Sequence, residues 1–250
     1  MNRRIVAAIA CRNNGSRLYG KPLQNLEVEK GITILDNILA CLKGFSVIDE
    51  VILAISKGDD NVIFKEIAEQ HNLRYVLGDE KDVLGRLVQA GDLGEATDIF
   101  RMTSESPFPF YQSIDRICAH HIKTGADATV LDNIIDGCGY EVISLEALRK
   151  SHTEGEDRHR SEHCSLFIRE NTDVFKIEKF TYMEELYRKD LRLTVDNPED
   201  LIVCRAVYKE FADDAPNFDL YKVVAFLDKN KHLRELIAPY TELGYSTMYQ

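Results

Sequence analysis

The chain has 250 residues, enough for one large α/β domain with a substantial core, and 44% of them are apolar. Its formal net charge of −11 argues against nucleic acid as a partner, because phosphate backbones are bound by positive fields. No apolar stretch approaches the length of a membrane span, and the first apolar run is too short for a signal peptide. We therefore expect a cytoplasmic protein that binds neither nucleic acid nor membrane.

Short apolar runs alternate with amphipathic segments through the first half of the chain. We expect strands at 5–10, 51–55, 74–77 and 97–102, and helices at 34–42, 82–93 and from 60 or 61 to about 71, the last burying Val62, Ile63, Ile67 and Ala68. Such alternation predicts βαβ units and a mainly parallel sheet. Ligands of such sheets bind outside the carboxyl ends of the strands, so the segments 10–21, 56–60, 77–82 and 103–107 are the ones to search.

The pattern changes from about residue 125. Strands are expected at 127–131 and 140–144, around a Gly137-Cys138-Gly139 turn, and again at 191–195. The polar stretch 151–163 is interpreted as a solvated helix start. Further helices are expected after 196–200, where Pro198 and two acids mark a first turn, and at 219–229 and 231–238. Because no repeat, low-complexity segment or linker interrupts the sequence, a single domain over 1–250 is predicted.

The six cysteines show no C-x-x-C spacing, so zinc or disulfide roles find no support and buried thiols are expected. They are Cys11, Cys41, Cys118, Cys138, Cys164 and Cys204. Cys11 stands apart because it lies where the first strand gives way to its loop.

Three cations follow the first strand: Arg12, Arg17 and Lys21, interleaved with Gly15 and Gly20. Glycines allow backbone N–H groups to approach a ligand, and the cations would neutralise its charge, so this loop suits a polyphosphate. Residues 15–21 fit G-x-x-x-x-G-K, but Pro22 stands where a Walker A loop needs Ser or Thr, and the chain after it looks extended. The sequence also lacks G-x-G-x-x-G, which argues against a dinucleotide dehydrogenase.

Five segments along the chain together form one pattern. The first is the loop Arg12-x₄-Arg17-Leu18-x-Gly20-Lys21-Pro22-Leu23. The others are Gly78-x₃-Asp82-Val83-Leu84-x-Arg86, Arg101-Met102-Thr103-Ser104-Glu105-Ser106-Pro107, Glu141-Val142 with Glu162-His163, and Arg192-Leu193-Thr194-Val195-Asp196-Asn197-Pro198-Glu199-Asp200-Leu201. In this order they resemble the cytidylyltransferases that make CMP-activated sugars, most closely those like spore coat polysaccharide biosynthesis protein F and CMP-3-deoxy-manno-octulosonate synthetase.

The resemblance implies a Rossmann-like, GT-A-type nucleotidyltransferase with a three-layer α/β/α arrangement, a mainly parallel sheet and a small β-excursion in the middle third. It implies a segment around 125–190 that projects for acceptor binding and dimerisation, and hence a homodimer. The substrates would be CTP and a small anionic acceptor, an acidic sugar or sugar-like compound in cell-surface polysaccharide or glycoconjugate synthesis. A hydroxyl of the acceptor attacks the α-phosphorus of CTP and pyrophosphate departs.

By the same resemblance, positions in this sequence take roles. Arg12, Arg17 and Lys21 would be catalytic, since Arg offers a bidentate fork and Lys a compact charge for the triphosphate. Glu105 and Asp196 would hold Mg²⁺, which carboxylates and phosphate oxygens coordinate. The nucleotide would be bound by Ala10, Cys11, Gly15, Gly78, Thr103 and Ser104, and the acceptor by Glu141, Arg158, Glu162 and His163.

Alternatives remain for several of these residues. Asp196 could instead cap the following helix, Glu105 could be a solvated loop acid, and His163 could be a core histidine. The family pattern has Ser at Gly15, Pro at Tyr19 and Asp at Glu105. Three functions stay open: CMP transfer to an acidic sugar, transfer to a sugar phosphate or alcohol phosphate, and an inactive nucleotide-binding paralogue that serves as a partner subunit.

Overall fold

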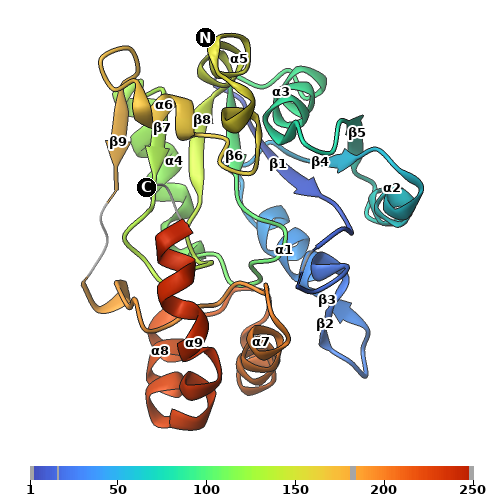
Figure 1. Cartoon of the computed structure of the whole chain (residues 1–250), viewed down its shortest axis with the longest axis vertical. Helices are drawn as coiled ribbons and strands as arrows, with labels where there is room; N and C mark the ends of the chain where they lie inside the picture. The colour runs from blue at the N-terminus through green and yellow to red at the C-terminus, as the bar shows by residue number, and fades with distance from the viewer. Residues whose placement is uncertain (1–2, 16, 181–183, 248–250) are drawn as a thin grey trace.

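The computed structural model describes residues 3–15, 17–180 and 184–247, so Ser16 of the first loop and the start Met1-Asn2 lie outside the described residues. A seven-stranded sheet forms the centre, in the order β5-β4-β1-β6-β8-β7-β9 (Figure 1). The strands in that order are β5 (Arg74–Gly78), β4 (Glu50–Ser56), β1 (Ile5–Cys11), β6 (Asp98–Arg101), β8 (Glu141–Ser144), β7 (Ala128–Val130) and β9 (Ile177–Lys179).

The sheet is mainly parallel, as the alternation of elements predicted. β1 pairs in parallel with β4 and β6, β4 with β5, and β7 with β9. β8 is antiparallel to both of its neighbours, β6 and β7. Segment 125–190 supplies β7, β8 and β9, so this part of the chain extends the same sheet. A small separate hairpin joins β2 (Asn25–Glu27) to β3 (Ile32–Thr33).

Helices cover both faces, which confirms the three-layer arrangement (Figure 1). Successive side chains of β1 point to opposite faces, and accordingly Ile5, Ala7 and Ile9 belong to one core cluster while Val6 and Ala8 belong to the other. The first face is covered by α1 (Ile34–Lys43), α2 (Val62–Gln70), α4 (Ile114–Thr124), α7 (Pro198–Glu210), α8 (Leu220–Lys229) and α9 (Lys231–Thr247). The second is covered by α3 (Val83–Leu93), α5 (Leu145–Glu154) and α6 (Leu166–Glu170).

Side-chain caps fix the starts of helices next to the carboxyl ends of the strands. Asp82 accepts a hydrogen bond of 2.8 Å from the N–H of Gly85 and so begins α3. At α7, Asn197 is the cap residue, and Asp200 Oδ2 accepts from the N–H groups of Asn197 at 2.8 Å and of Asp196 at 3.0 Å. The carboxylate of Asp196 therefore does not cap α7, which removes that alternative for it.

Several predicted elements differ in the structure. Residues 191–195 form no named strand; Arg192 makes one isolated bridge to Asp136, because a single backbone bond there, from Leu193 N–H to the Asp136 carbonyl, does not extend into a ladder. The stretch 151–163 is not a helix start: it completes α5 and continues in the 3₁₀ turn Asp157–Arg160.

The predicted inner face of α2 was half wrong. Ile67 and Ala68 are buried, but Val62 and Ile63 are 41% and 38% exposed, and Phe64 takes their place in the core. The helix α4 was not anticipated, and α9 continues beyond the expected 238 to Thr247. After Lys21 the chain makes a short 3₁₀ turn, Lys21–Leu23, before β2.

All six cysteines are buried free thiols, as expected. None of the helices in the described ranges combines the length and hydropathy that crossing a bilayer requires.

Candidate active site

The loop after β1 is anchored through Asn13, which is 4% exposed. Its N–H donates to Asn61 Oδ1 at 2.8 Å, its carbonyl accepts from the N–H of Gly20 at 2.8 Å, and its side-chain amide contacts the Asp60 carbonyl. Gly20 has φ +60°, and a Cβ at Gly15 would lie 2.3 Å from the Leu18 carbonyl oxygen. The loop therefore needs both glycines, and Asn61 serves it as an acceptor in addition to preceding α2.

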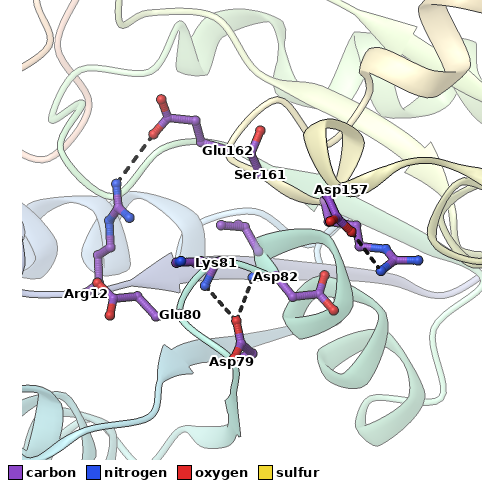
Figure 2. A pocket seen from close by; sticks show the side chains of 10 residues that line it. Arg12, Asp79, Glu80, Lys81, Asp82, Asp157, Ser161 and Glu162 are labelled. Atoms are coloured by element: carbon purple, nitrogen blue, oxygen red, sulfur yellow. Dashed lines mark hydrogen bonds and ion pairs between the residues drawn. The ribbon is translucent and has the colours of Figure 1, made fainter.

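Two cations of this loop converge on Asp196. Lys21 Nζ lies 2.6 Å and Arg17 Nη2 lies 3.1 Å from Asp196 Oδ1. Burial alone would raise the pKa of Asp196, but the hydrogen bond from Lys21 and the charges of Lys21, Arg17 and Arg192 hold it below its ordinary value. Arg12 lies apart from this group and pairs with Glu162 at 3.6 Å (Figure 2).

Glu105 is the least compensated acid of the site. Its one side-chain hydrogen bond is from Ser104 Oγ at 3.3 Å, and no cation lies within ion-pair distance of its carboxylate among the described residues. Burial and the charge of Asp196 raise the pKa of Glu105, an effect that Lys21 offsets in part. A half-buried carboxylate beside a second carboxylate, with little cationic compensation, has the chemistry of a divalent-cation ligand.

The pair forms only part of a cage. Within residues 3–15, 17–180 and 184–247, no three His, Cys, Asp or Glu side chains gather as a metal site, so phosphate oxygens and water would have to complete the coordination. This combination is the usual one for Mg²⁺, which keeps several waters and binds through one or two carboxylates.

A cavity of about 380 Å³ brings most of the predicted residues together at the carboxyl ends of β1 and β6. Its lining includes twelve of the fifteen predicted positions: Ala10, Arg12, Gly15, Arg17, Lys21, Thr103, Ser104, Glu105, Glu141, Glu162, His163 and Asp196. Thr103 is bridged to Ala10, and its hydroxyl hydrogen-bonds Ser106 Oγ at 2.6 Å, so adjacent strands fix this wall.

Three predicted residues do not line the cavity. Cys11 is buried, and burial raises the pKa of its thiol to about 12, so it is an inert part of the core. Gly78 packs on Arg86, since a Cβ at Gly78 would lie 2.4 Å from Arg86 Cγ. Arg158 is exposed and pairs with Glu170 at 2.6 Å, away from the cavity.

Opposite the loop, Glu141 is held in a buried network. Arg169 contacts it at 2.7 Å, Ser165 donates to it at 2.5 Å and Arg101 lies 3.3 Å away. Burial would raise the pKa of Glu141, but the charges of Arg169 and Arg101 lower it overall, so the carboxylate is anionic. Arg101 also donates to the Glu162 carbonyl at 2.6 Å, which ties this wall to the segment that carries His163.

Several side chains that shape the site had no role predicted for them. Arg86, 1% exposed, donates to the carbonyls of Ala54 at 2.6 Å and Cys11 at 3.3 Å and thereby joins β4, β1 and α3. Asp136 lines the cavity and is 7% exposed. Arg86 and Arg101 stand at named positions of the quoted motifs, which was the available signal, whereas Asn13 stands at an unspecified position of the first motif and Asp136 lies outside all of them.

A second cavity, of about 710 Å³, adjoins the first at Arg12, Val83 and Glu162. Figure 2 shows Arg12 reaching toward Glu162 on one side of it, with the loop Asp79–Asp82 and the turn that carries Asp157 and Ser161 around the rest. Asp79 accepts from the N–H groups of Lys81 at 2.8 Å and Asp82 at 3.2 Å, so this loop is internally braced.

The chain is similar to several known proteins. A family model described as cytidylyltransferase matches residues 6–240. An uncharacterized protein of Methanocaldococcus jannaschii is 30% identical over 97% of this chain and 98% of its own length. Spore coat polysaccharide biosynthesis protein SpsF of Bacillus subtilis is 25% identical over 90% of this chain and 95% of its own.

Solved structures share the fold. A cytidylyltransferase from Leptospira borgpetersenii has a TM-score of 0.83 at 20% identity, covering 93% of this chain and 97% of that one. CMP:2-keto-3-deoxy-manno-octonic acid synthetase, solved with CTP, has a TM-score of 0.62 at 12% identity, covering 83% and 99%. Because the family model spans nearly the whole chain and the fold and motifs agree with it, this chain belongs to the cytidylyltransferase family of CTP-dependent nucleotidyltransferases.

Proposed function

We propose that this enzyme transfers CMP from CTP to a hydroxyl of an acidic sugar or sugar-like acceptor in cell-surface polysaccharide or glycoconjugate synthesis. The observation that carries the proposal is the meeting, in one cavity, of the loop cations with Glu105 and Asp196. The names of two relatives support it, since one is a spore coat polysaccharide biosynthesis protein and another a CMP-sugar acid synthetase.

In this reaction the acceptor oxygen forms a bond to the α-phosphorus while the bond to the bridging oxygen of pyrophosphate breaks, and the hydroxyl proton is lost. Negative charge builds up on the departing pyrophosphate. Arg12, Arg17 and Lys21 would stabilise it from a loop whose backbone is fixed by the Asn13 anchor. The protein's contribution is then positioning and electrostatics.

Mg²⁺ would be held by Glu105 and Asp196, and when bound it supplies positive charge next to the phosphate oxygens. Lys21 and Arg17 occupy Asp196 Oδ1 in the structure, so these two cations would turn toward the triphosphate as it enters. Ala10, Gly15, Thr103 and Ser104 would contact the nucleotide, and Glu141, Glu162 and His163 the acceptor. Cys11, Gly78 and Arg158 are left out of this site because they do not line it.

We also infer that the chain acts as a homodimer in the cytoplasm, with CTP and the acceptor as its small-molecule partners. β9 supports the dimer because it lies at the edge of the sheet, where unpaired backbone groups can accept a second chain. Light scattering at several protein concentrations tests this inference, and a mass of one chain throughout would contradict it.

Pyrophosphate release tests the main proposal. The enzyme, CTP and Mg²⁺ are incubated with eight- and nine-carbon 2-keto acids, and separately with sugar 1-phosphates and alcohol phosphates. Release with a 2-keto acid supports the proposal; release with a phosphate acceptor alone replaces it by the second candidate. Tight CTP binding without release for any acceptor would favour an inactive paralogue.

The variant Glu105→Gln sharpens this test. It should lower the rate of pyrophosphate release about 100-fold, because the cation loses a charged ligand, yet it should not lower the folding stability, since the carboxylate is poorly compensated. Glu66→Gln, on the exposed face of α2, is the matched control and should leave both quantities unchanged.

A further inference from the structure

Arg192 is a buried guanidinium surrounded by acids. It is 2% exposed, and its nitrogens lie 2.6 Å from Asp196, 2.9 Å from Asp200 and 3.3 Å from Asp136. Its Nη1 also donates to the Tyr240 carbonyl at 3.1 Å. One side chain therefore joins the loop between β7 and β8, the cavity, the first turn of α7 and helix α9.

The two oxygens of Asp196 have different partners. Lys21 and Arg17 contact Oδ1 from the loop, whereas Arg192 contacts Oδ2 from the protein interior. Lys21 and Arg17 line the cavity, but Arg192 does not. A triphosphate can therefore compete with Asp196 for the first two cations, while Arg192 has no path to the ligand and stays with the carboxylate.

Resting on the proposed function, we propose that Arg192 is a positioning residue, which holds Asp196 by Oδ2 so that Oδ1 faces the cavity when a cation and nucleotide are bound. Residues that hydrogen-bond a metal ligand and fix its orientation affect the metal affinity as well as the reaction rate. Asp200 completes this support, because Oδ2 of Asp200 accepts from the backbone N–H of Asp196 while its other oxygen faces Arg192.

The chain offers a matched control in Arg188. This residue also bridges two aspartates, at 2.8 Å from both Asp190 and Asp228, and ties the chain to α8. None of the three lines either cavity described above. Arg192→Lys and Arg188→Lys thus each remove a guanidinium that bridges aspartates. Arg192 contacts Asp196 of the site, whereas Arg188 lies away from both cavities.

The test measures binding of Mn²⁺ in the presence of CTP by electron paramagnetic resonance, together with the thermal midpoint, kcat and the KM for CTP. Arg192→Lys should weaken Mn²⁺ binding about 10- to 100-fold and lower kcat, with a smaller change in KM because the loop cations remain. Arg188→Lys should lower the midpoint and leave Mn²⁺ binding unchanged. Equal Mn²⁺ affinity in Arg192→Lys and the wild type would overturn the proposal.

If Arg192→Lys fails to fold, the double variant Asp136→Asn/Arg192→Lys is compared with the single variant Asp136→Asn. The double variant leaves one fewer buried acid without a partner than Arg192→Lys does, because Asp136 is then neutral. The same weakening relative to Asp136→Asn supports the proposal, and its absence overturns it. A wild-type enzyme that binds no Mn²⁺ in the presence of CTP would overturn both the metal site and this role, while pyrophosphate release would still report separately on cytidylyl transfer.

Discussion

The two ends of the central strands use the same kinds of residue for different purposes. At the amino end of β6, Asp98 is fully buried and contacts Arg3 and, at 3.0 Å, His121, whose other ring nitrogen lies 2.9 Å from Thr129 Oγ. At the carboxyl end, Asp196 pairs with cations that also face a cavity, and Glu105 has no cation at ion-pair distance within the described chain.

This difference in how the charges are paired distinguishes a structural charge cluster from a binding site. Glu50 near the amino end is a further example, because hydrogen bonds from Arg74 at 2.6 Å and Arg4 at 2.9 Å lower its pKa despite partial burial. Where acids and bases are fully matched, no charge is left for a ligand. Where they are mismatched beside a cavity, a ligand completes the balance.

The largest effect is expected at the structural end. Asp98→Ala should lower the free energy of unfolding by about 3–5 kcal/mol, because it leaves His121 and Arg3 without their shared partner. The KM for CTP should not change. Chemical denaturation measures the loss, with Asp115→Ala on the exposed side of α4 as control, expected to stay within about 1 kcal/mol. A loss of activity in Asp98→Ala without a loss of stability would contradict a purely structural role for Asp98.

At the other end the expected effect falls on the rate. Lys21→Met should lower kcat/KM for CTP about 10²- to 10³-fold, roughly 3–4 kcal/mol of transition-state stabilisation, because it removes one of the charges facing the triphosphate. Lys30→Met, on the exposed hairpin, is the control and should keep full activity. A drop below tenfold for Lys21→Met would show that the loop cations act mainly on structure.

Asp136 supplies a pH-dependent test of intermediate size. Burial raises its pKa from 3.8 to about 6, with Arg192 opposing the shift. The folded state therefore disfavours the ionised carboxylate of Asp136. The protonated side chain contributes roughly 3 kcal/mol to the free energy of unfolding below about pH 4, and this contribution is lost as the pH rises through about 6. Asp136→Asn should lack this loss. Denaturation curves of the two proteins from pH 4 to 7 measure it, and parallel pH profiles would contradict it.

The smallest effect is expected at Arg158. The family resemblance placed it in the acceptor site, but in the structure it forms an exposed pair with Glu170. Exposed pairs contribute little to stability, so Arg158→Ala should leave both the thermal midpoint and the KM for the acceptor essentially unaltered. A marked rise in that KM would restore Arg158 to the site and require this segment to rearrange on binding.

The sequence alone predicted the layered α/β fold and most of the residues that line the cavity. Local periodicity identified β1, β4, β5 and α3, since each buries residues at the spacing its geometry requires. The loop cations and both proposed metal ligands were predicted because they follow apolar segments within recognisable motifs. The strand predicted at 191–195 was wrong, because an apolar extended segment forms a strand only if a neighbouring strand offers it a matching edge.

Only the tertiary structure decided how the charges are partnered. Arg158 and Arg192 are both arginines in charged segments, yet Arg158 is exposed and Arg192 is buried among three aspartates, of which two belong to its own segment and Asp136 to the loop between β7 and β8. Burial and the distance between charged groups set the energy of each charge–charge interaction, and neither quantity follows from local sequence. The same limit applies to Asn13, whose anchor at Asn61 exists only once the loops after β1 and β4 lie side by side.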